Sequence, residues 1–190
     1  MPAIELRPGF FVFAIVLAAL DRSGSVLPIL CAMTVHELAH ILAMLACGGR
    51  IRKLTLRFAD FQILSSGLGY RQELFAALAG PLVNLVCGAA FCMQRPVFAA
   101  YSLFLGIYNL LPVWPLDGGR MIRCILLARL PLGQAERVSG TISYCVCGLL
   151  LAAGLFLTFF RKTGLWPLGT AVYLTLRLLT LAERENRMGC

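Results

Sequence analysis

Six apolar stretches follow one another along this chain, and short polar segments separate them. About 20 consecutive apolar residues are needed to cross the hydrocarbon core of a bilayer, and most of these stretches reach that length. The pattern predicts an all-α polytopic membrane protein with about six transmembrane helices in a single domain, residues 1–190. We place the stretches at 9–20, 26–47, 72–93, 96–116, 139–160 and 165–182.

The composition agrees with insertion into a membrane. Hydrophobic residues make up 59% of the chain and charged residues 14%, whereas a soluble domain has about 45–50% apolar and about 25% charged residues. The formal net charge of +8 raises the alternative of a nucleic-acid partner. In so apolar a chain, basic loops that face an anionic inner leaflet explain the charge better. We therefore expect the lipid bilayer as a partner and no nucleic acid.

The positions of the basic residues predict an orientation. With the N-terminus in the cytosol, most of the 17 Lys and Arg residues fall in cytosolic segments. Only Arg22, Arg95, Arg161 and Lys162 then fall outside. By the positive-inside rule both termini are expected in the cytosol. The first stretch is expected to be a span and not a signal peptide, because no net positive segment precedes it and no small-residue cleavage site follows.

The second stretch contains the segment HELAH, which holds both histidines of the chain, His36 and His40. At a spacing of i, i+4 on a helix the two rings lie on one face and can bind one ion. Glu37 lies about 100° round the helix from His36, near the ion without having to ligate it. This H-E-x-x-H arrangement is typical of a zinc site in which the glutamate is the general base toward zinc-bound water.

The alternative interpretation of HELAH is a hydrogen-bonded histidine pair in an ordinary helix core. Ionisable groups inside a membrane are costly and by default functional, which favours the metal site. The cysteines give no competing site: the chain has 8, none of them in a C-x-x-C pair, and they indicate neither a zinc site nor a disulfide framework.

Asp117 is the acid that best fits a third zinc ligand. A catalytic zinc has three protein ligands and an open position for water, and the chain has no third histidine. Most of the other acids lie in termini or polar loops beside basic residues. Asp117 instead ends the apolar run SLFLGIYNLLPVWPLDGGR. In the predicted topology it reaches the same side of the membrane as His40.

The residues around Asp117 predict an irregular backbone. Pro112 and Pro115 disfavour helix before it, and Gly118 and Gly119 permit turns that other residues avoid. Irregular backbone at membrane depth is tolerated where it is buried in protein or lines a water-filled cavity, and hydrolysis needs such a cavity. The alternative is an ordinary Pro-Gly loop after a helix.

Three segments together resemble the signatures of the site-2 proteases, a family of intramembrane zinc metalloproteases. They are HELAH, AGPLVN (79–84) and NLLPVWPLDGG (109–119), and the resemblance covers roughly residues 30–125. It implies a three-helix catalytic core at about 26–120, with accessory helices at about 9–20 and 139–182. It also implies Zn²⁺ as cofactor, His36, His40 and Asp117 as its ligands, and Glu37 as the base.

The six-span layout with short loops is most similar to the sporulation-type branch of that family. This similarity implies a bacterial cell-membrane protein and a membrane-tethered substrate such as a transcription (sigma) factor precursor. An inhibitory membrane protein is a further candidate partner. Members of the branch often carry a C-terminal nucleotide-binding regulatory domain. Only AERENRMGC follows Leu181, so no such domain is expected in this sequence.

Two further features adjoin the predicted site. The stretch RKLTLRFADFQIL (52–64) alternates apolar and polar residues with the period of a half-buried strand. It is expected either as a membrane-associated β-hairpin, whose edge can accept an unwound substrate by strand addition, or as a basic loop on the lipid surface. Asn84 and Asn109 are lone amides in apolar spans. They are expected to join helices by hydrogen bonds or, as the resemblance favours chiefly for Asn109, to contact substrate.

Three other functions share part of this sequence pattern. A heat-shock-type membrane zincin would need a glutamate ligand in a later N-E-x-x-A segment, which the sequence lacks. A zinc carrier or channel would place further acids and histidines along several spans. A catalytically inactive zinc-binding scaffold stays open, although the intact Glu37 argues against it.

Overall fold

The computed structural model describes residues 3–6, 19, 21, 24–57, 60–162 and 164–188. The side chains of residues 3–6, 52–65 and 184–188 are not part of this description. Apart from Ala19, the predicted first span at 9–20 therefore lies outside the described residues. The chain divides into two compact units, Met1–Asn109 and Leu110–Cys190, which are described one at a time. The prediction of a single domain stays a prediction.

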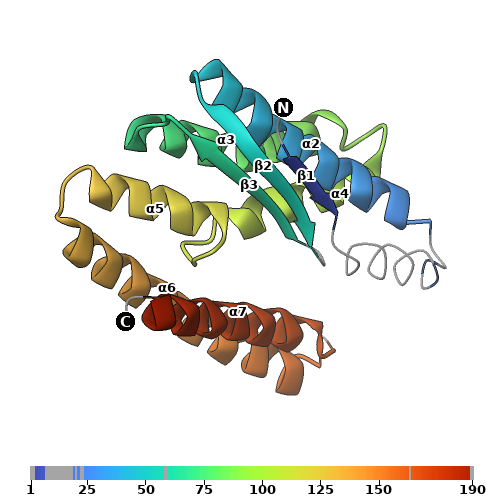
Figure 1. Cartoon of the computed structure of the whole chain (residues 1–190). Helices are drawn as coiled ribbons and strands as arrows, with labels where there is room; N and C mark the ends of the chain where they lie inside the picture. The colour runs from blue at the N-terminus through green and yellow to red at the C-terminus, as the bar shows by residue number, and fades with distance from the viewer. Residues whose placement is uncertain are drawn as a thin grey trace. The chain divides into compact units, whose positions relative to one another are not determined.

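Three helices form the core of the first unit. They are α2 (Val26–Ala46), α3 (Tyr70–Ala90) and α4 (Pro96–Asn109), and each contacts the other two (Figure 1). Small residues such as Ala76, Gly80 and Gly106 are buried where the helices pack. Leu42 and Phe75, by contrast, are 57% and 64% exposed. Small residues inside and large apolar residues outside are typical of helices that pack in lipid, where close backbone approach replaces the hydrophobic effect.

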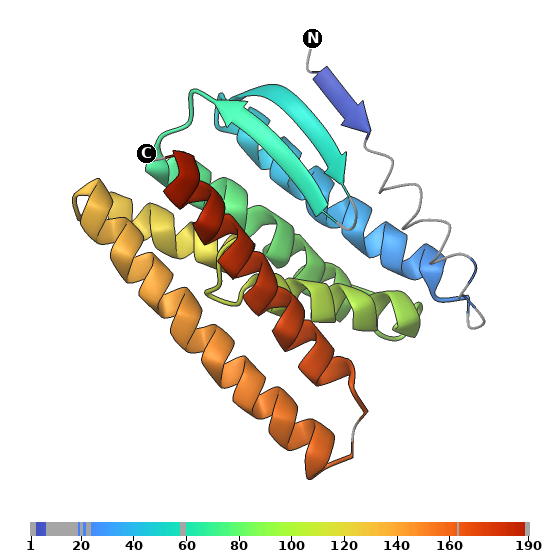
Figure 2. The ribbon, with the colours of Figure 1, turned by 60° about the horizontal axis from the view of Figure 1, so that its bottom comes forward.

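A three-stranded sheet adjoins these helices. Its strands are β1 (Ala3–Leu6), β2 (Arg50–Arg57) and β3 (Asp60–Ser66), in the order β1-β2-β3. β2 and β3 pair antiparallel, while β1 pairs parallel with β2. β2 and β3 both contact α2, as Figure 2 also shows. Of the two forms expected for residues 52–64, the structure has the hairpin. β1 was not expected, because four residues are too few to show a periodic pattern.

The second unit consists of α5 (Asp117–Leu127), α6 (Leu132–Phe159) and α7 (Trp166–Met188). α6 and α7 lie side by side as a helical hairpin, and α5 packs against α6 (Figures 1 and 2). Gly154 allows the close approach of α6 and α7, because a Cβ there would lie 3.0 Å from Leu168 Cα.

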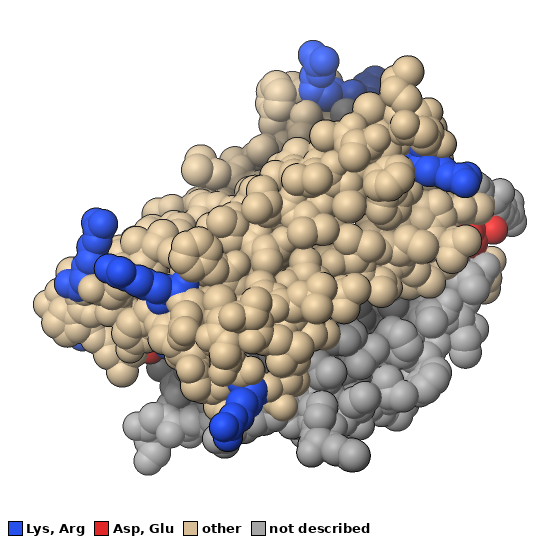
Figure 3. Space-filling model, turned by 90° about the horizontal axis from the view of Figure 1, so that it is seen from above, with Lys and Arg blue, Asp and Glu red and all other residues tan. Residues whose placement is uncertain are grey.

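Three of the described helices, α2, α3 and α6, are long and apolar enough to cross a membrane. α4 has 14 residues, a length of about 21 Å, which is shorter than a typical bilayer core. The face shown in Figure 3 carries only scattered Lys and Arg side chains on a surface that is otherwise largely uncharged. The mostly helical membrane fold is confirmed, and the number of spans stays a prediction.

The predicted span at 96–116 ends earlier than expected. α4 stops at Asn109, residues 110–116 are irregular, and a new helix starts at Asp117. Pro112 explains this end, because it cannot donate a hydrogen bond to the preceding turn and disfavours helix at the residue before it. The placement of Asp117 at the end of the fourth span was therefore wrong: it is the first residue of α5.

Candidate metal centre

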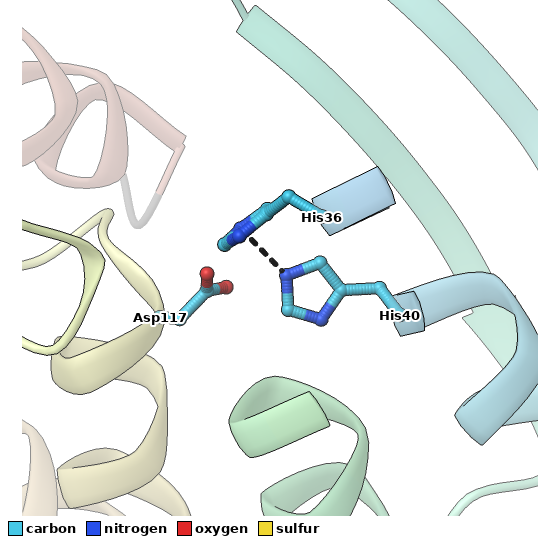
Figure 4. Close-up of side chains that lie close together, drawn as sticks. All are labelled: His36, His40 and Asp117. Atoms are coloured by element: carbon cyan, nitrogen blue, oxygen red, sulfur yellow. Dashed lines mark hydrogen bonds between the residues drawn. The ribbon is translucent and has the colours of Figure 1, made fainter. Parts of the chain in front are cut away.

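The two histidines of α2 face each other inside the first unit. His36 and His40 are 4% and 3% exposed, and their Nε2 atoms lie 3.1 Å apart (Figure 4). The rings meet edge to face, with centroids 4.7 Å apart. Two nitrogen ligands at about 2.0–2.1 Å from a tetrahedral zinc lie about 3.3 Å from each other. The pair therefore has nearly the spacing that zinc requires.

Helix α3 supports both rings from their outer sides. His40 Nδ1 lies 2.7 Å from the Ala76 carbonyl oxygen, and His36 Nδ1 lies 3.3 Å from Asn84 Nδ2. Gly80 lies between these two contacts, and a Cβ there would overlap His40 and lie 2.9 Å from His36 Cε1. Residues 76, 80 and 84 are spaced by four and so lie on one face of α3. We call them the α3 stripe.

With both rings neutral and the Asn84 amide in the orientation of this structure, the contacts fit the following pattern of ring protons. Asn84 Nδ2 can only donate, so His36 Nδ1 accepts and the His36 proton is on Nε2. That Nε2–H donates to His40 Nε2, which leaves the His40 proton on Nδ1. Nδ1–H of His40 then donates to the Ala76 carbonyl. A carbonyl on the outer nitrogen is the usual way to keep Nε2 of a histidine ready for a metal.

Asp117 occupies a defined position in the second unit. It is 7% exposed, lies in the first turn of α5 and pairs with Arg120, whose Nη1 is 3.6 Å from Asp117 Oδ1. A carboxylate is favourable there because the N-terminus of a helix is positive. The preceding loop is anchored on α6, because Trp114 N–H donates to Ser143 Oγ over 3.1 Å. The Trp114–Pro115 peptide bond is cis.

The role predicted for Gly118 and Gly119 was wrong. Both are helical, and neither is among the glycines with positive φ. Their lack of a side chain matters for space, because a Cβ on Gly118 would overlap the Leu110 carbonyl and one on Gly119 would lie 2.5 Å from Trp114 N. The glycines thus let the loop 110–116 lie directly on the first turn of α5.

The remaining predicted residues differ in their surroundings. Glu37 is half-buried on α2, next to His36 in the chain. Asn84 is fully buried, with its amide on His36. Asn109 donates to the Leu105 carbonyl of its own helix over 3.1 Å. Substrate contact by Asn84 and Asn109 stays a prediction.

Sequence reasoning missed the support of the histidines by the Ala76 carbonyl and by Gly80. The segment AGPLVN contains Gly80, but a glycine in a helix does not by itself show what it approaches. The Asp117–Arg120 pair was missed as well, although the i, i+3 spacing was a usable signal.

These features define a class: a polytopic helical membrane protein with a metal centre of the H-E-x-x-H type. The first unit offers the imidazole nitrogens of His36 and His40, and the second unit offers the carboxylate of Asp117. This is a donor set that suits Zn²⁺.

Comparison with known proteins agrees with this class. A profile of peptidase family M50 matches residues 93–153, the part of the chain that includes Asn109 and Asp117. Stage IV sporulation protein FB of Bacillus subtilis is 28% identical over 160 residues, which cover 77% of this chain and 56% of that protein. A zinc metalloprotease of Methanocaldococcus jannaschii is 27% identical over 172 residues, covering 80% and 51% of the two chains.

A solved structure is also similar in fold. The site-2 protease from Methanocaldococcus jannaschii superposes with a TM-score of 0.67 at 21% identity, covering 93% of this chain and 89% of that one. The chain is thus similar to members of peptidase family M50 in sequence and to a site-2 protease in fold. It spans about half the length of the curated relatives it matches.

Proposed function

We propose that this chain is an intramembrane zinc metalloendopeptidase. The observation that carries the proposal is the buried pair of Nε2 atoms of His36 and His40, which face each other at 3.1 Å. Asp117 is the proposed third ligand, because it is a buried carboxylate in a family-matched segment. The match of residues 93–153 to peptidase family M50 and the names of the relatives support zinc as the metal.

The proposed mechanism assigns the proton transfers to Glu37. Zinc, when bound, supplies a Lewis acid that lowers the pKa of a ligand water toward about 7 and polarises the scissile carbonyl. Glu37 accepts the proton of the attacking water and then donates it to the amine of the leaving fragment. Its place beside His36 on the same helical turn suits this transfer, because it adjoins the ligands without being one of them.

The proposed substrate is the transmembrane segment of a membrane-tethered protein. A helical substrate hides its carbonyls in its own hydrogen bonds and has to unwind before attack. In the part of the chain that the structure describes, β3 pairs with a strand on one side only, so its other edge can receive an extended segment by strand addition. Asn109 is the proposed substrate contact.

The similarity to a sporulation protein supports a sigma factor precursor as the specific substrate. An inhibitory membrane protein is the proposed regulator. Co-expression with candidate membrane-tethered precursors, with cleavage followed on gels, tests the choice of substrate. The proposed substrate class would be contradicted if none of these precursors were cleaved when co-expressed with this protein.

The proposed ligands predict the metal content. Protein purified in detergent without chelator should contain close to one zinc per chain. The double variant His36→Ala with His40→Ala should contain none, and Asp117→Asn should lose zinc more readily, because a neutral amide is a poorer ligand than a carboxylate. Elemental analysis before and after dialysis against a chelator measures both effects. Wild-type protein without metal, or a double variant with unchanged metal, would overturn the zinc site.

The proposed orientation, with both termini in the cytosol, predicts opposite accessibility at the two ends of α6. Arg137 and Arg161 are both exposed and lie near its two ends. In a background without native cysteines, Arg161→Cys should react with an impermeant maleimide added to intact cells. Arg137→Cys should react only after the cells are opened. The reverse pattern would contradict the orientation.

A further inference from the structure

Asn84 carries an amide oxygen that has no role in the hydrogen-bond pattern of this structure. Its side chain is 0% exposed, and Oδ1 has no hydrogen-bond partner among the described residues. Nδ2 of the same amide faces His36 Nδ1 at 3.3 Å. Leaving a buried amide oxygen without a partner costs about 1–3 kcal/mol, so a buried oxygen of this kind calls for an explanation.

A zinc ion on both Nε2 atoms requires a different proton on His36. A neutral histidine that ligates through Nε2 carries its proton on Nδ1. The His36 proton therefore moves from Nε2 to Nδ1, and no proton is gained or lost. Nδ1–H would then face Asn84 Nδ2, which is also a donor. His40 needs no such change, because its Nδ1–H already donates to the Ala76 carbonyl.

We propose that the Asn84 amide turns over when zinc binds, so that Oδ1 accepts from His36 Nδ1–H. This inference rests on the proposed zinc site. Asn84 is then a positioning residue for His36, and its amide serves both patterns: Nδ2 donates to an acceptor Nδ1, and Oδ1 accepts from a donor Nδ1. A side chain that has only a donor, or only an acceptor, can support only one of these two hydrogen-bond patterns.

The test compares substitutions of Asn84 by their effect on zinc affinity. Loss of an outer partner of a metal-bound histidine typically weakens the metal about 10–100-fold. Asn84→Leu keeps the approximate shape without an acceptor and should show this loss. Asn84→Asp can only accept, as the turned amide does toward His36, and should bind zinc at least as tightly as wild type. Competition with a chelating dye in detergent gives the affinities, and thermal unfolding of the metal-stripped proteins shows whether each variant is folded.

A matched control sharpens the test. Gln134→Leu also removes a side-chain amide, but Gln134 is exposed in the first turn of α6 and is not part of the proposed site, so this change should leave zinc affinity unchanged. If Asn84→Leu is unfolded when stripped of metal, Asn84→Ala takes its place.

The outcomes separate the inference from the zinc site itself. Wild-type protein that binds no zinc would refute the zinc site. Wild-type protein that binds zinc while Asn84→Leu binds it equally well would refute only the role of Asn84. Asn84→Asp that loses as much affinity as Asn84→Leu would show that the amide is needed as a donor, and the proposed turn would be wrong.

Discussion

Glu37→Gln should abolish cleavage while leaving the metal in place. The amide keeps the size of the carboxylate but cannot take a proton from the attacking water. The loss of a general base typically lowers the rate about 10²–10⁴-fold. Because Glu37 is proposed as base and not as ligand, the variant should still insert, bind one zinc per chain and bind substrate. Single-turnover cleavage of a membrane-tethered substrate, with zinc content measured on the same sample, gives both readouts.

Glu73→Gln is the matched control for this change. Glu73 lies in the first turn of α3 and is half-buried, as Glu37 is, but it is not part of the H-E-x-x-H segment. Its substitution should leave cleavage close to wild type. Cleavage by Glu37→Gln at the wild-type rate would contradict the protease mechanism and leave a zinc-binding scaffold as the better description.

Gly80→Ala should displace the histidine pair. The new methyl group would overlap His40 and lie 2.9 Å from His36 Cε1, so at least one ring has to move. Overpacking of this kind typically costs about 1–3 kcal/mol. If this free energy is lost from the zinc-binding arrangement of the His36 and His40 rings, zinc affinity drops about 5–150-fold. Dye competition for zinc and thermal unfolding measure the effect.

Helix propensity alone predicts that Gly80→Ala stabilises the protein, so the measurement can separate the two effects. Replacing glycine by alanine in a helix normally stabilises it by about 0.4–1 kcal/mol. Gly140→Ala is the matched control, because Gly140 is also helical and a Cβ there meets nothing within 4 Å. It should keep its zinc and unfold at the same or a higher temperature. Equal zinc affinity in Gly80→Ala and Gly140→Ala would mean that the close approach of α3 is unimportant.

The membrane helices could be predicted because each carries a long apolar run. α2, α3 and α6 match the expected stretches to within a few residues, apart from the earlier start of α6. α5 was missed, since its 11 residues begin with Asp-Gly-Gly, include two arginines and are too few to span a membrane. Pro112 and Pro115 predicted an irregular backbone before Asp117, but residues 110–116 were still counted in the span at 96–116. β1 was invisible because its pairing with β2 is a long-range contact.

The candidate ligands could be identified because their spacing is a local property of the sequence. His36 and His40 lie on one helical face whatever surrounds them. The groups that support the two histidines, by contrast, come from a distant part of the sequence. The Ala76 carbonyl is a backbone atom that any residue supplies, and the approach of Gly80 depends on how α2 and α3 pack. The partner of the Asn84 amide depends on the same packing, so the sequence alone left both helix association and substrate contact open for it.

The α3 stripe fixes how α2 and α3 can be aligned with each other, both along their axes and in rotation. Ala76 and Asn84 each meet one histidine, and the spacings of eight residues on α3 and four on α2 keep both contacts in step. A single residue inserted between 76 and 84 would rotate one contact by about 100° relative to the other. Outward-facing positions such as Phe75 and Val86, which are 64% and 59% exposed, carry no such constraint. The centre therefore tolerates drift in the composition of α3 but not in its length, and insertions and deletions should be confined to its ends.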